Sequence, residues 1–247
     1  MIELFQSILT IDLLGAVGIG LLGGLMHGYT GWGGAMVMMP LMSVLYGPVY
    51  ALAIILMGGI MVSVQLFPWA IRRVDWREMT PMFIAIAVSI PGGTYLLFLL
   101  DPTLVIRIIG FLIIGAALVQ LIGWSYAGPR GVVPATVAGV MCGTINGFAG
   151  LGGPPLVLYV LSKPDPPDQQ KANILIAVAI VCVGAFVAVA VGGGVTGPVA
   201  ARGVIVAPAQ MAGAWLGASL FSILPGDFFK KFSLIMLIIL GFMVAIF

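Results

Sequence analysis

The sequence has very little charge. Only 7% of its 247 residues are Asp, Glu, Lys or Arg and 62% are hydrophobic. Soluble globular domains carry about 25% charged residues, so a soluble fold is excluded and a polytopic membrane protein is predicted. The net charge of +2 comes without a basic cluster, which argues against nucleic acid as a partner.

Histidine, cysteine and intramembrane carboxylates are also scarce. His27 is the only histidine, and Cys142 and Cys182 lie in apolar runs, which argues against a disulfide framework or a set of metal ligands. The aspartates fall at the predicted ends of apolar runs or in loops. An intramembrane enzyme needs a nucleophile with a base, or a set of metal ligands, and pumps commonly need a buried carboxylate. We therefore predict neither an enzyme nor a bound cofactor.

The first twelve residues, MIELFQSILTID, contain no Lys or Arg. A cleavable signal peptide begins with a basic segment, so we expect residue 1 to remain in the mature protein. We expect an integral protein of the plasma membrane, in a bacterial cell the inner membrane. The sequence leaves open whether it is a monomer or a homodimer.

Glycine is abundant, and its placement is repeated. Segment 20–34, GLLGGLMHGYTGWGG, returns 119 residues later as segment 139–153, GVMCGTINGFAGLGG, and the six positions identical in both copies are all glycine. The chain is therefore predicted to be a duplication, with a first repeat over 1–128 and a second over 129–247. Irregular backbone at membrane depth is tolerated only inside protein or beside a water-filled cavity. Such paired breaks are a sequence signature of a transporter's binding site.

Six apolar stretches are long enough to cross about 30 Å of hydrocarbon as helices. They cover about 50–70, 80–100 and 103–124 in the first repeat, and about 172–191, 203–224 and 229–247 in the second. The glycine segments that precede them, about 13–46 and 133–162, are each a kinked span or a hairpin. The predicted fold is an all-α polytopic membrane protein with one integral membrane domain.

The basic residues favour the hairpin. If each glycine segment enters and leaves on one side, the second repeat is inverted relative to the first and only Arg107 and Arg202 lie on one face. The other face then carries Arg72, Arg73, Arg77, Arg130, Lys163, Lys171, Lys230 and Lys231. If each segment crossed once, the two faces would carry five basic residues each. Cytoplasmic loops are enriched in Lys and Arg, so we predict two inverted repeats, each a hairpin followed by three spans, with both termini outside the cytoplasm.

The breaks suit an anion. Where a helix restarts, its first N–H groups have no partner within the helix and carry the positive end of the helix dipole. Two such restarts, after Gly33–Gly34 and after the segment 152–155, GGPP, would bind an anion without Lys or Arg if they met near the middle of the membrane. Pro154 suits the first turn of a helix, where proline needs no donor.

Helix packing is the alternative reading of some of these glycines. Gly20, Gly24 and Gly28 are spaced by four, as are their counterparts in the second copy, Gly139, Gly143 and Gly147. This small-residue spacing favours close contact between membrane helices. The GxGG segments at 31–34 and 150–153 have a different spacing, and for them we favour a ligand site.

Polar side chains near the breaks are candidates for binding the anion. His27 and Asn146 occupy the same repeat position, and polar groups at membrane depth suggest function. Their alternative role is to bind loose carbonyl groups of the break, and for Asn173 and Gln210 it is an interhelical hydrogen bond. The predicted substrate-binding residues are His27, Thr30, Gly31, Trp32, Gly33, Gly34, Asn146, Gly150, Gly152, Gly153, Pro154, Asn173 and Gln210.

The sequence resembles a known family. The GxGG breaks at 31–34 and 150–153, the loop VDWR at 74–77 and the two-fold layout resemble the sulfite exporter TauE/SafE family of anion permeases over essentially the whole chain. Typical members carry a further glycine where this sequence has Ala35 and Pro154. The resemblance implies movement of sulfite, sulfonates or related organic anions, usually outward.

The predicted function is a secondary transporter that exports small sulfur-containing or organic anions by alternating access around the paired breaks. A monoanion leaving a cell gains roughly 2.3 kcal/mol per 100 mV of membrane potential, so export needs no coupling ion. His27 is the one candidate for proton coupling. A channel for anions or small solutes is the alternative, and its flux would not saturate. The expected partners are a small anion, such as sulfite, a sulfonate or a carboxylate, and the lipid bilayer.

Overall fold

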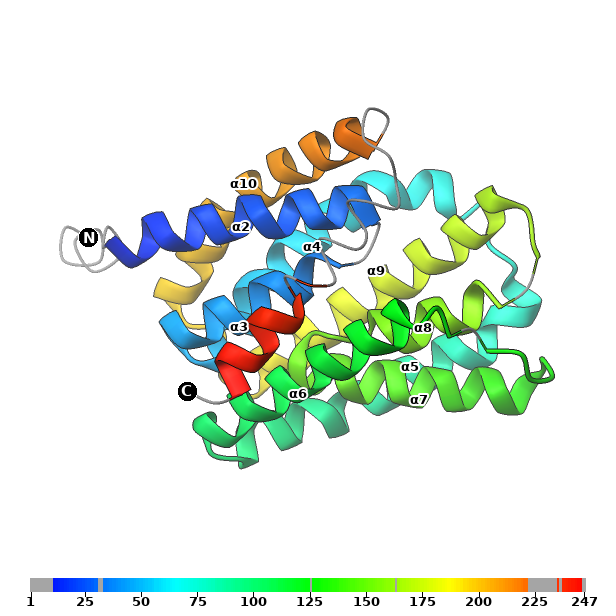
Figure 1. Cartoon of the computed structure of the whole chain (residues 1–247), viewed down its shortest axis with the longest axis horizontal. Coiled ribbons are helices and arrows are strands. Elements are labelled where there is room, and N and C mark those ends of the chain that lie inside the picture. The colour runs from blue at the N-terminus through cyan, green and yellow to red at the C-terminus, as the bar shows by residue number, and fades with distance from the viewer. Residues whose placement is uncertain are drawn as a thin grey trace.

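The computed structural model describes residues 11–30, 33–124, 126–162, 164–221, 235 and 237–245, and its regular structure in these ranges is α-helical. The helices are α2 (Ile11–Thr30), α3 (Gly34–Tyr46), α4 (Pro48–Ala70), α5 (Trp76–Leu99), α6 (Pro102–Leu121), α7 (Val132–Ala149), α8 (Gly153–Val160), α9 (Pro167–Val191) and α10 (Gly197–Phe221). Residues 237–245 form a last helix that packs on α6, where Gly110 meets Gly241 (Figure 1).

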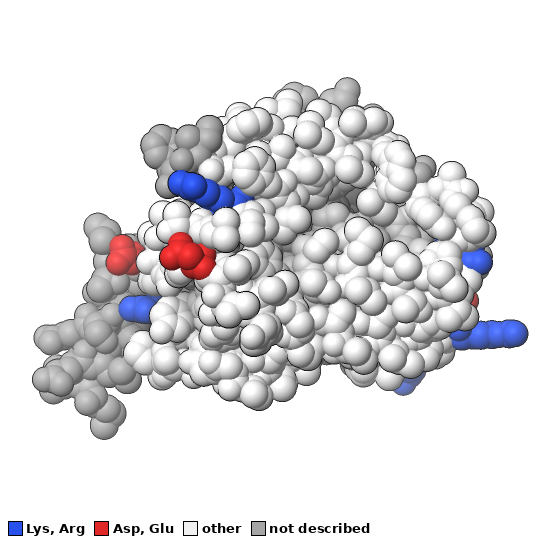
Figure 2. Space-filling model, turned by 90° about the horizontal axis from the view of Figure 1, so that it is seen from below, with Lys and Arg blue, Asp and Glu red and all other residues white. Residues whose placement is uncertain are grey.

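The molecule has the character of a membrane protein. Within the described ranges, α5, α6, α7, α9 and most of α10 are long and apolar enough to cross a bilayer. Figure 2 shows charged side chains towards the two ends of the long axis and a broad uncharged band between them. The prediction of an all-helical polytopic membrane protein is confirmed.

Local sequence explains where the helices begin. The carboxylate of Asp75 accepts a hydrogen bond from the N–H of Glu78 at 3.1 Å, so α5 starts at Trp76, four residues earlier than predicted. Asp101 caps α6 in the same way through the N–H of Thr103 at 2.8 Å, and this hydrogen bond lowers the pKa of the Asp101 carboxyl. Proline occupies the first position of α4, α6 and α9, where its missing N–H costs nothing.

Each glycine segment turns back on itself. Gly15 of α2 lies opposite Leu45 of α3, and Gly23 lies opposite Met38. In the second segment, Gly152 lies against α7 at Cys142. The chain therefore forms a helical hairpin at both places, α2 with α3 and α7 with α8.

The two halves exchange packing partners. Helix α2 lies along α10 on one side of the molecule, and α7 lies along α5 on the other (Figure 1). The glycine stripe of α2, Gly20, Gly24 and Gly28, faces the α10 backbone at Val206, Gln210 and Ala214. The stripe of α7, Gly139, Gly143 and Gly147, faces the α5 backbone at Met82, Ile86 and Ile90. These stripes pack helices together, which is the role that their spacing favoured.

Helices α4 and α9 cross the centre in opposite directions. Val49, at the start of α4, lies against Gly194, just after the end of α9. Gly59 then meets Cys182, and the ring of Trp69 at the far end of α4 lies 5.5 Å from Nζ of Lys171. Helices α4 and α9 each follow a hairpin in the chain, and they pack against each other antiparallel.

Candidate functional site

The second break begins with a left-handed glycine. Helix α7 ends at Ala149, and Gly150 follows with φ 69° and ψ 11°, its N–H bound to the Asn146 carbonyl oxygen at 2.8 Å. Residues with a Cβ rarely adopt this conformation, so glycine is favoured here. The turn directs the chain back towards α7.

Gly152 allows the returning chain to approach α7 closely. A Cβ atom on Gly152 would lie 2.5 Å from the Cys142 carbonyl oxygen and 2.8 Å from Cβ of Asn146. No side chain fits in this space without movement of the backbone. Helix α8 restarts at the next residue, Gly153.

Asn146 is the polar group at this restart. It is buried, with 4% of its surface exposed, and its Oδ1 accepts a long hydrogen bond from the Gly152 N–H at 3.4 Å. Its Nδ2 is buried and has no hydrogen-bond partner among the described residues. A buried donor without an acceptor costs about 1–3 kcal/mol, so such a group calls for a functional explanation. Its two N–H bonds suit an oxyanion.

The first turn of α8 offers few backbone N–H donors. Pro154 and Pro155 follow Gly153 and carry no N–H, so only Gly152 and Gly153 supply donors before Leu156. Helix α3 starts with Gly34 and Ala35, both of which have an N–H. The start of α8 therefore offers fewer backbone N–H donors than the start of α3, because two of its first residues are prolines.

The first break has the same close approach. A Cβ atom on Gly34 would lie 2.6 Å from the Gly23 carbonyl oxygen and 2.8 Å from Cβ of His27. Gly33, the residue before α3, is buried. Of the other predicted residues here, Gly31 and Trp32 lie outside the described residues, as does the side chain of Thr30, the last residue of α2.

His27 and Asn146 therefore have matching environments. Each lies on the outgoing helix of its hairpin, and each has its Cβ against the glycine at the start of the returning helix. The two contacts differ by one position, because Gly34 corresponds to Gly153 at the repeat interval of 119 residues, whereas Asn146 meets Gly152.

Asn173 and Gln210 lie at other places. Asn173 is buried near the start of α9, and its Oδ1 accepts the N–H of Asp75 at 2.9 Å, which ties the loop between α4 and α5 to α9. Gln210 is buried in α10 between Gly24 of α2 and Gly58 of α4, and its Oε1 has no partner within the described part of the chain. Asn173 thus makes the contact between helices that was its alternative role, whereas Oε1 of Gln210 lies between helices without the expected hydrogen bond to a described residue.

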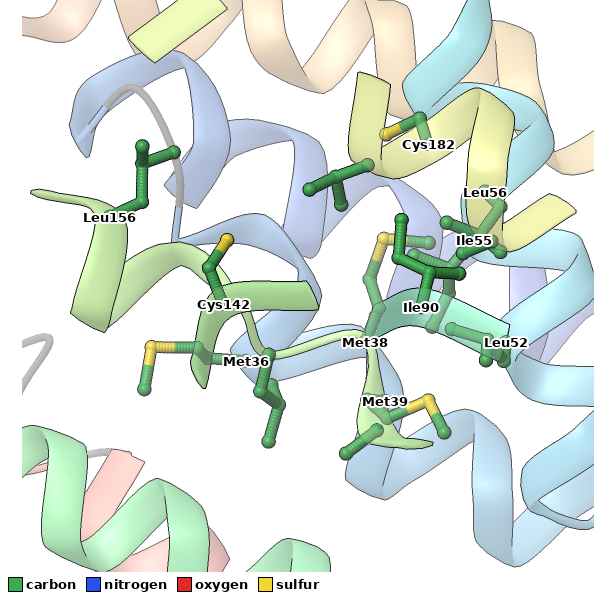
Figure 3. Packing of buried hydrophobic residues seen from close by; sticks show 14 of the residues in the cluster. Met36, Met38, Met39, Leu52, Ile55, Leu56, Ile90, Cys142, Leu156 and Cys182 are labelled. Carbon is green, nitrogen blue, oxygen red and sulfur yellow. The ribbon is translucent and has the colours of Figure 1, made fainter. Parts of the chain in front are cut away.

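The two hairpins meet through methionines. A Cβ atom on Gly150 would lie 4.0 Å from Sδ of Met39 in α3. Figure 3 shows Met36 and Met38 in the same buried cluster as Cys142 and Leu156 of the second hairpin. The sequence showed the methionine-rich stretch 36–42 but gave no sign that it would face the other repeat.

A cavity of about 610 Å³ borders the second break. It is formed by α6, α7 and α8, and Leu151, Pro154 and Pro155 belong to its wall. Pro154, a predicted binding residue, thus faces a space lined almost entirely by hydrocarbon and aromatic groups. Such a lining offers an anion few donors, chiefly the hydroxyl of Tyr159 at its edge, so the polar side of the break, at Asn146, is the better candidate.

Comparison with protein families identifies the class of the protein. The model of the family Sulfite exporter TauE/SafE matches residues 16–244. The chain belongs to this family. TauE/SafE proteins are membrane transporters of sulfite-type anions, which agrees with the general class predicted from the sequence. No curated protein and no solved structure matches this TauE/SafE chain.

Proposed function

We propose that this TauE/SafE chain is a secondary transporter that exports small sulfur-containing or organic anions, such as sulfite or an organosulfonate. Membership of the family supports transport of sulfite-type anions across a membrane. The observation that carries the finer proposal is the buried Nδ2 of Asn146, which has no partner among the described residues and lies beside the restart of α8. An oxyanion is the ligand that this donor and the neighbouring backbone N–H groups would favour.

The proposed anion site consists of neutral donors. On the second hairpin they are the Asn146 amide and the N–H of Gly153, and on the first the amides at the start of α3, with His27 behind them. The sequence proposes Thr30, Gly31 and Trp32 as further ligands of the first break. A site without a fixed cation binds an anion weakly enough to release it, which transport requires.

Alternating access between inverted repeats is the proposed mechanism. The exchange of partners between α2–α10 and α7–α5 supports it, as does the antiparallel contact of α4 with α9. The hairpins carry the breaks, so rocking of one half against the other would expose the site to each side in turn. Export of a monoanion would then run on the membrane potential, at roughly 2.3 kcal/mol per 100 mV.

Replacement of Asn146 by leucine tests the site. In proteoliposomes supplied with sulfite, sulfoacetate, thiosulfate or simple carboxylates, the wild type is expected to transport one chemical class. Because a hydrogen bond to a charged group contributes about 1.5–3 kcal/mol, Asn146→Leu should raise the KM for that class about ten-fold or more.

Gln120→Leu is the matched control for this experiment. Among the described residues, Nε2 of Gln120 donates to the Ala116 carbonyl oxygen of its own helix, at 3.2 Å, so its loss should leave KM unchanged. An unchanged KM in Asn146→Leu, or an equal rise in both variants, would reject Asn146 as a ligand. Uptake that stays linear with anion concentration would favour the channel instead of the carrier.

A further inference from the structure

A single arginine joins the end of α8 to α5. Arg130 lies just before α7 and forms an ion pair with Glu78 of α5. Its Nη2 also donates to the carbonyl oxygens of Tyr159 and Val160, the last residues of α8, at 2.6 and 3.0 Å. The last carbonyls of a helix carry the negative end of its dipole, and the Tyr159 carbonyl also accepts the hydroxyl of Ser162 at 2.7 Å. Arg130 therefore fixes the end of α8 that lies opposite the break.

Two further contacts complete this cluster. Nη2 of Arg130 lies 3.1 Å from Oγ of Ser162, and its guanidinium stacks 4.8 Å from the centre of the Tyr159 ring. Both Arg130 and Glu78 are largely buried, with 18% and 19% of their side chains exposed. Shielding from water makes such a pair stronger than one at the surface.

A second arginine joins the end of α3 to α10. The guanidinium of Arg202, near the start of α10, lies 4.8 Å from the centre of the Tyr46 ring. Tyr46 is the last residue of α3, so this contact also holds the end of a returning helix. Asp12, in the first turn of α2, lies at the same end of the first hairpin as Tyr46, because Gly15 of α2 lies opposite Leu45 of α3.

The two clusters occupy matching places in the two halves. Ser43 and Ser162, each near the end of a returning helix, are 119 residues apart, the same interval that separates the glycine segments. Glu78 and Arg202 are 124 residues apart, and the same interval separates the α5 and α10 residues that face the glycine stripes, such as Ile86 and Gln210. The sign of the charge differs, however, because α5 carries the acidic Glu78 where α10 carries the basic Arg202.

The clusters lie at opposite ends of the molecule. Tyr46 precedes α4, whereas Trp69, near the far end of α4, contacts Arg73 and Lys171 close to the start of α5. Glu78 is in the first turn of α5. The Arg130 cluster therefore lies at the end that carries Arg73, and the Arg202 cluster at the other.

We propose that these clusters are the two gates of the transporter. The Arg130 latch (Arg130, Glu78, Tyr159 and Ser162) holds the end of α8 closed on one face, and the Arg202 latch (Asp12, Tyr46 and Arg202) holds the end of α3 closed on the other. One latch opens at a time, so the breaks become accessible from one face only. The proposal rests on the alternating access proposed above, and it names the residues that control access from each face of the membrane.

The reactivity of Cys142 can report whether a gate is open. It is fully buried, and its Sγ lies against Gly152 at the second break. In a Cys182→Ala background it is the only cysteine of the chain. Its rate of reaction with a membrane-impermeant methanethiosulfonate, applied to vesicles of each orientation, measures access to the break from each face without any substrate.

Removal of the Arg130 latch should open one face. Loss of one or two kcal/mol of closing free energy corresponds to a factor of about 5–30, so Arg130→Gln should raise labelling of Cys142 from the Arg130 face by that factor. Labelling from the opposite face should not increase. Arg202→Gln should give the reverse pattern.

Three further variants control the experiment. Glu78→Gln should raise labelling from the same face, though by less than Arg130→Gln, because Arg130 keeps its bonds to the α8 carbonyls. The double variant should be no more reactive than Arg130→Gln, since that variant already removes the ion pair. Arg77→Gln changes an exposed neighbour at the same end and should leave labelling unchanged. If Arg130→Gln elutes as aggregate, Glu78→Gln alone decides the question.

The outcomes separate this proposal from the proposed function. Equal labelling from both faces, or no change in Arg130→Gln and Glu78→Gln, would overturn the latches even if anion transport is measured. A one-sided change in a protein that transports none of the tested anions would support the latches and count against the proposed substrate class.

Discussion

At Gly34 and Gly152 the outgoing and returning helices of each hairpin are too close for any side chain. The nearest atoms include a backbone carbonyl oxygen, at 2.6 Å from a Cβ on Gly34 and 2.5 Å from one on Gly152. A backbone atom cannot rotate away as a side chain can, so an added methyl group must displace a helix. The hydrogen-bond donors at the breaks keep their positions only because these two residues are glycine.

Gly152→Ala should therefore destabilise the protein. Overpacking costs about 1–3 kcal/mol, which corresponds to a fall in Tm of about 2–12 °C for a chain of this size. Differential scanning fluorimetry in detergent measures the change. Gly18→Ala is the matched control, because nothing lies within 4 Å of a Cβ at Gly18 in the middle of α2, and alanine favours a helix. A Tm for Gly152→Ala equal to that of Gly18→Ala would refute the close approach.

At the scale of the helices, contact between the two halves depends on the glycine stripes. Gly143 of α7 faces the backbone of Ile86, and Gly24 of α2 faces the backbone of Gln210. Since lipid tails are as apolar as leucine, membrane helices associate through close packing rather than through the hydrophobic effect. The hairpins are thus attached to the opposite half by the residues that have the smallest side chains.

Gly143→Leu should separate α7 from α5. We expect a protein that is still inserted into the membrane but elutes as aggregate in fluorescence-detected size-exclusion chromatography. Gly115→Leu in α6 is the control, because nothing lies within 4 Å of a Cβ at that position, and this variant should elute as the wild type does. A monodisperse peak for Gly143→Leu would show that the stripe is not needed for assembly.

For the whole molecule, the distribution of charge predicts its orientation. Among the described basic residues, Arg73 and Lys171 share the ring of Trp69 at one end, where Arg72, Arg77 and Arg130 also lie. Arg202 lies at the other end beside Tyr46, and Arg107 follows the turn between α5 and α6. The excess of positive charge at one end favours its location in the cytoplasm.

A map of labelled cysteines tests this orientation. In a background without native cysteines, Arg72→Cys should react only with reagent on the cytoplasmic side, and a cysteine added after residue 247 should react only from outside. The charge bias and the hairpins predict this result together. A C-terminus labelled from the cytoplasm would contradict the inverted topology.

The sequence by itself determined the class of fold and the places where the helices break. Apolar stretches of about 20 residues can only be helices in a bilayer, and repeated glycines mark interrupted segments wherever they occur. Family membership followed from the same motifs. Asn146 and His27 could be singled out because they are polar and hold the same repeat position.

Only the tertiary structure decided which groups meet. The ion pair of Arg130 with Glu78 joins residues 52 positions apart, and the hydrogen bond of Asn173 with Asp75 joins residues 98 apart. The partners of the glycine stripes lie in the opposite half, and Met39 reaches Gly150 of the other hairpin. Local sequence encodes helices and their ends, but contacts between distant helices depend on how all of them pack at once, which no single segment specifies.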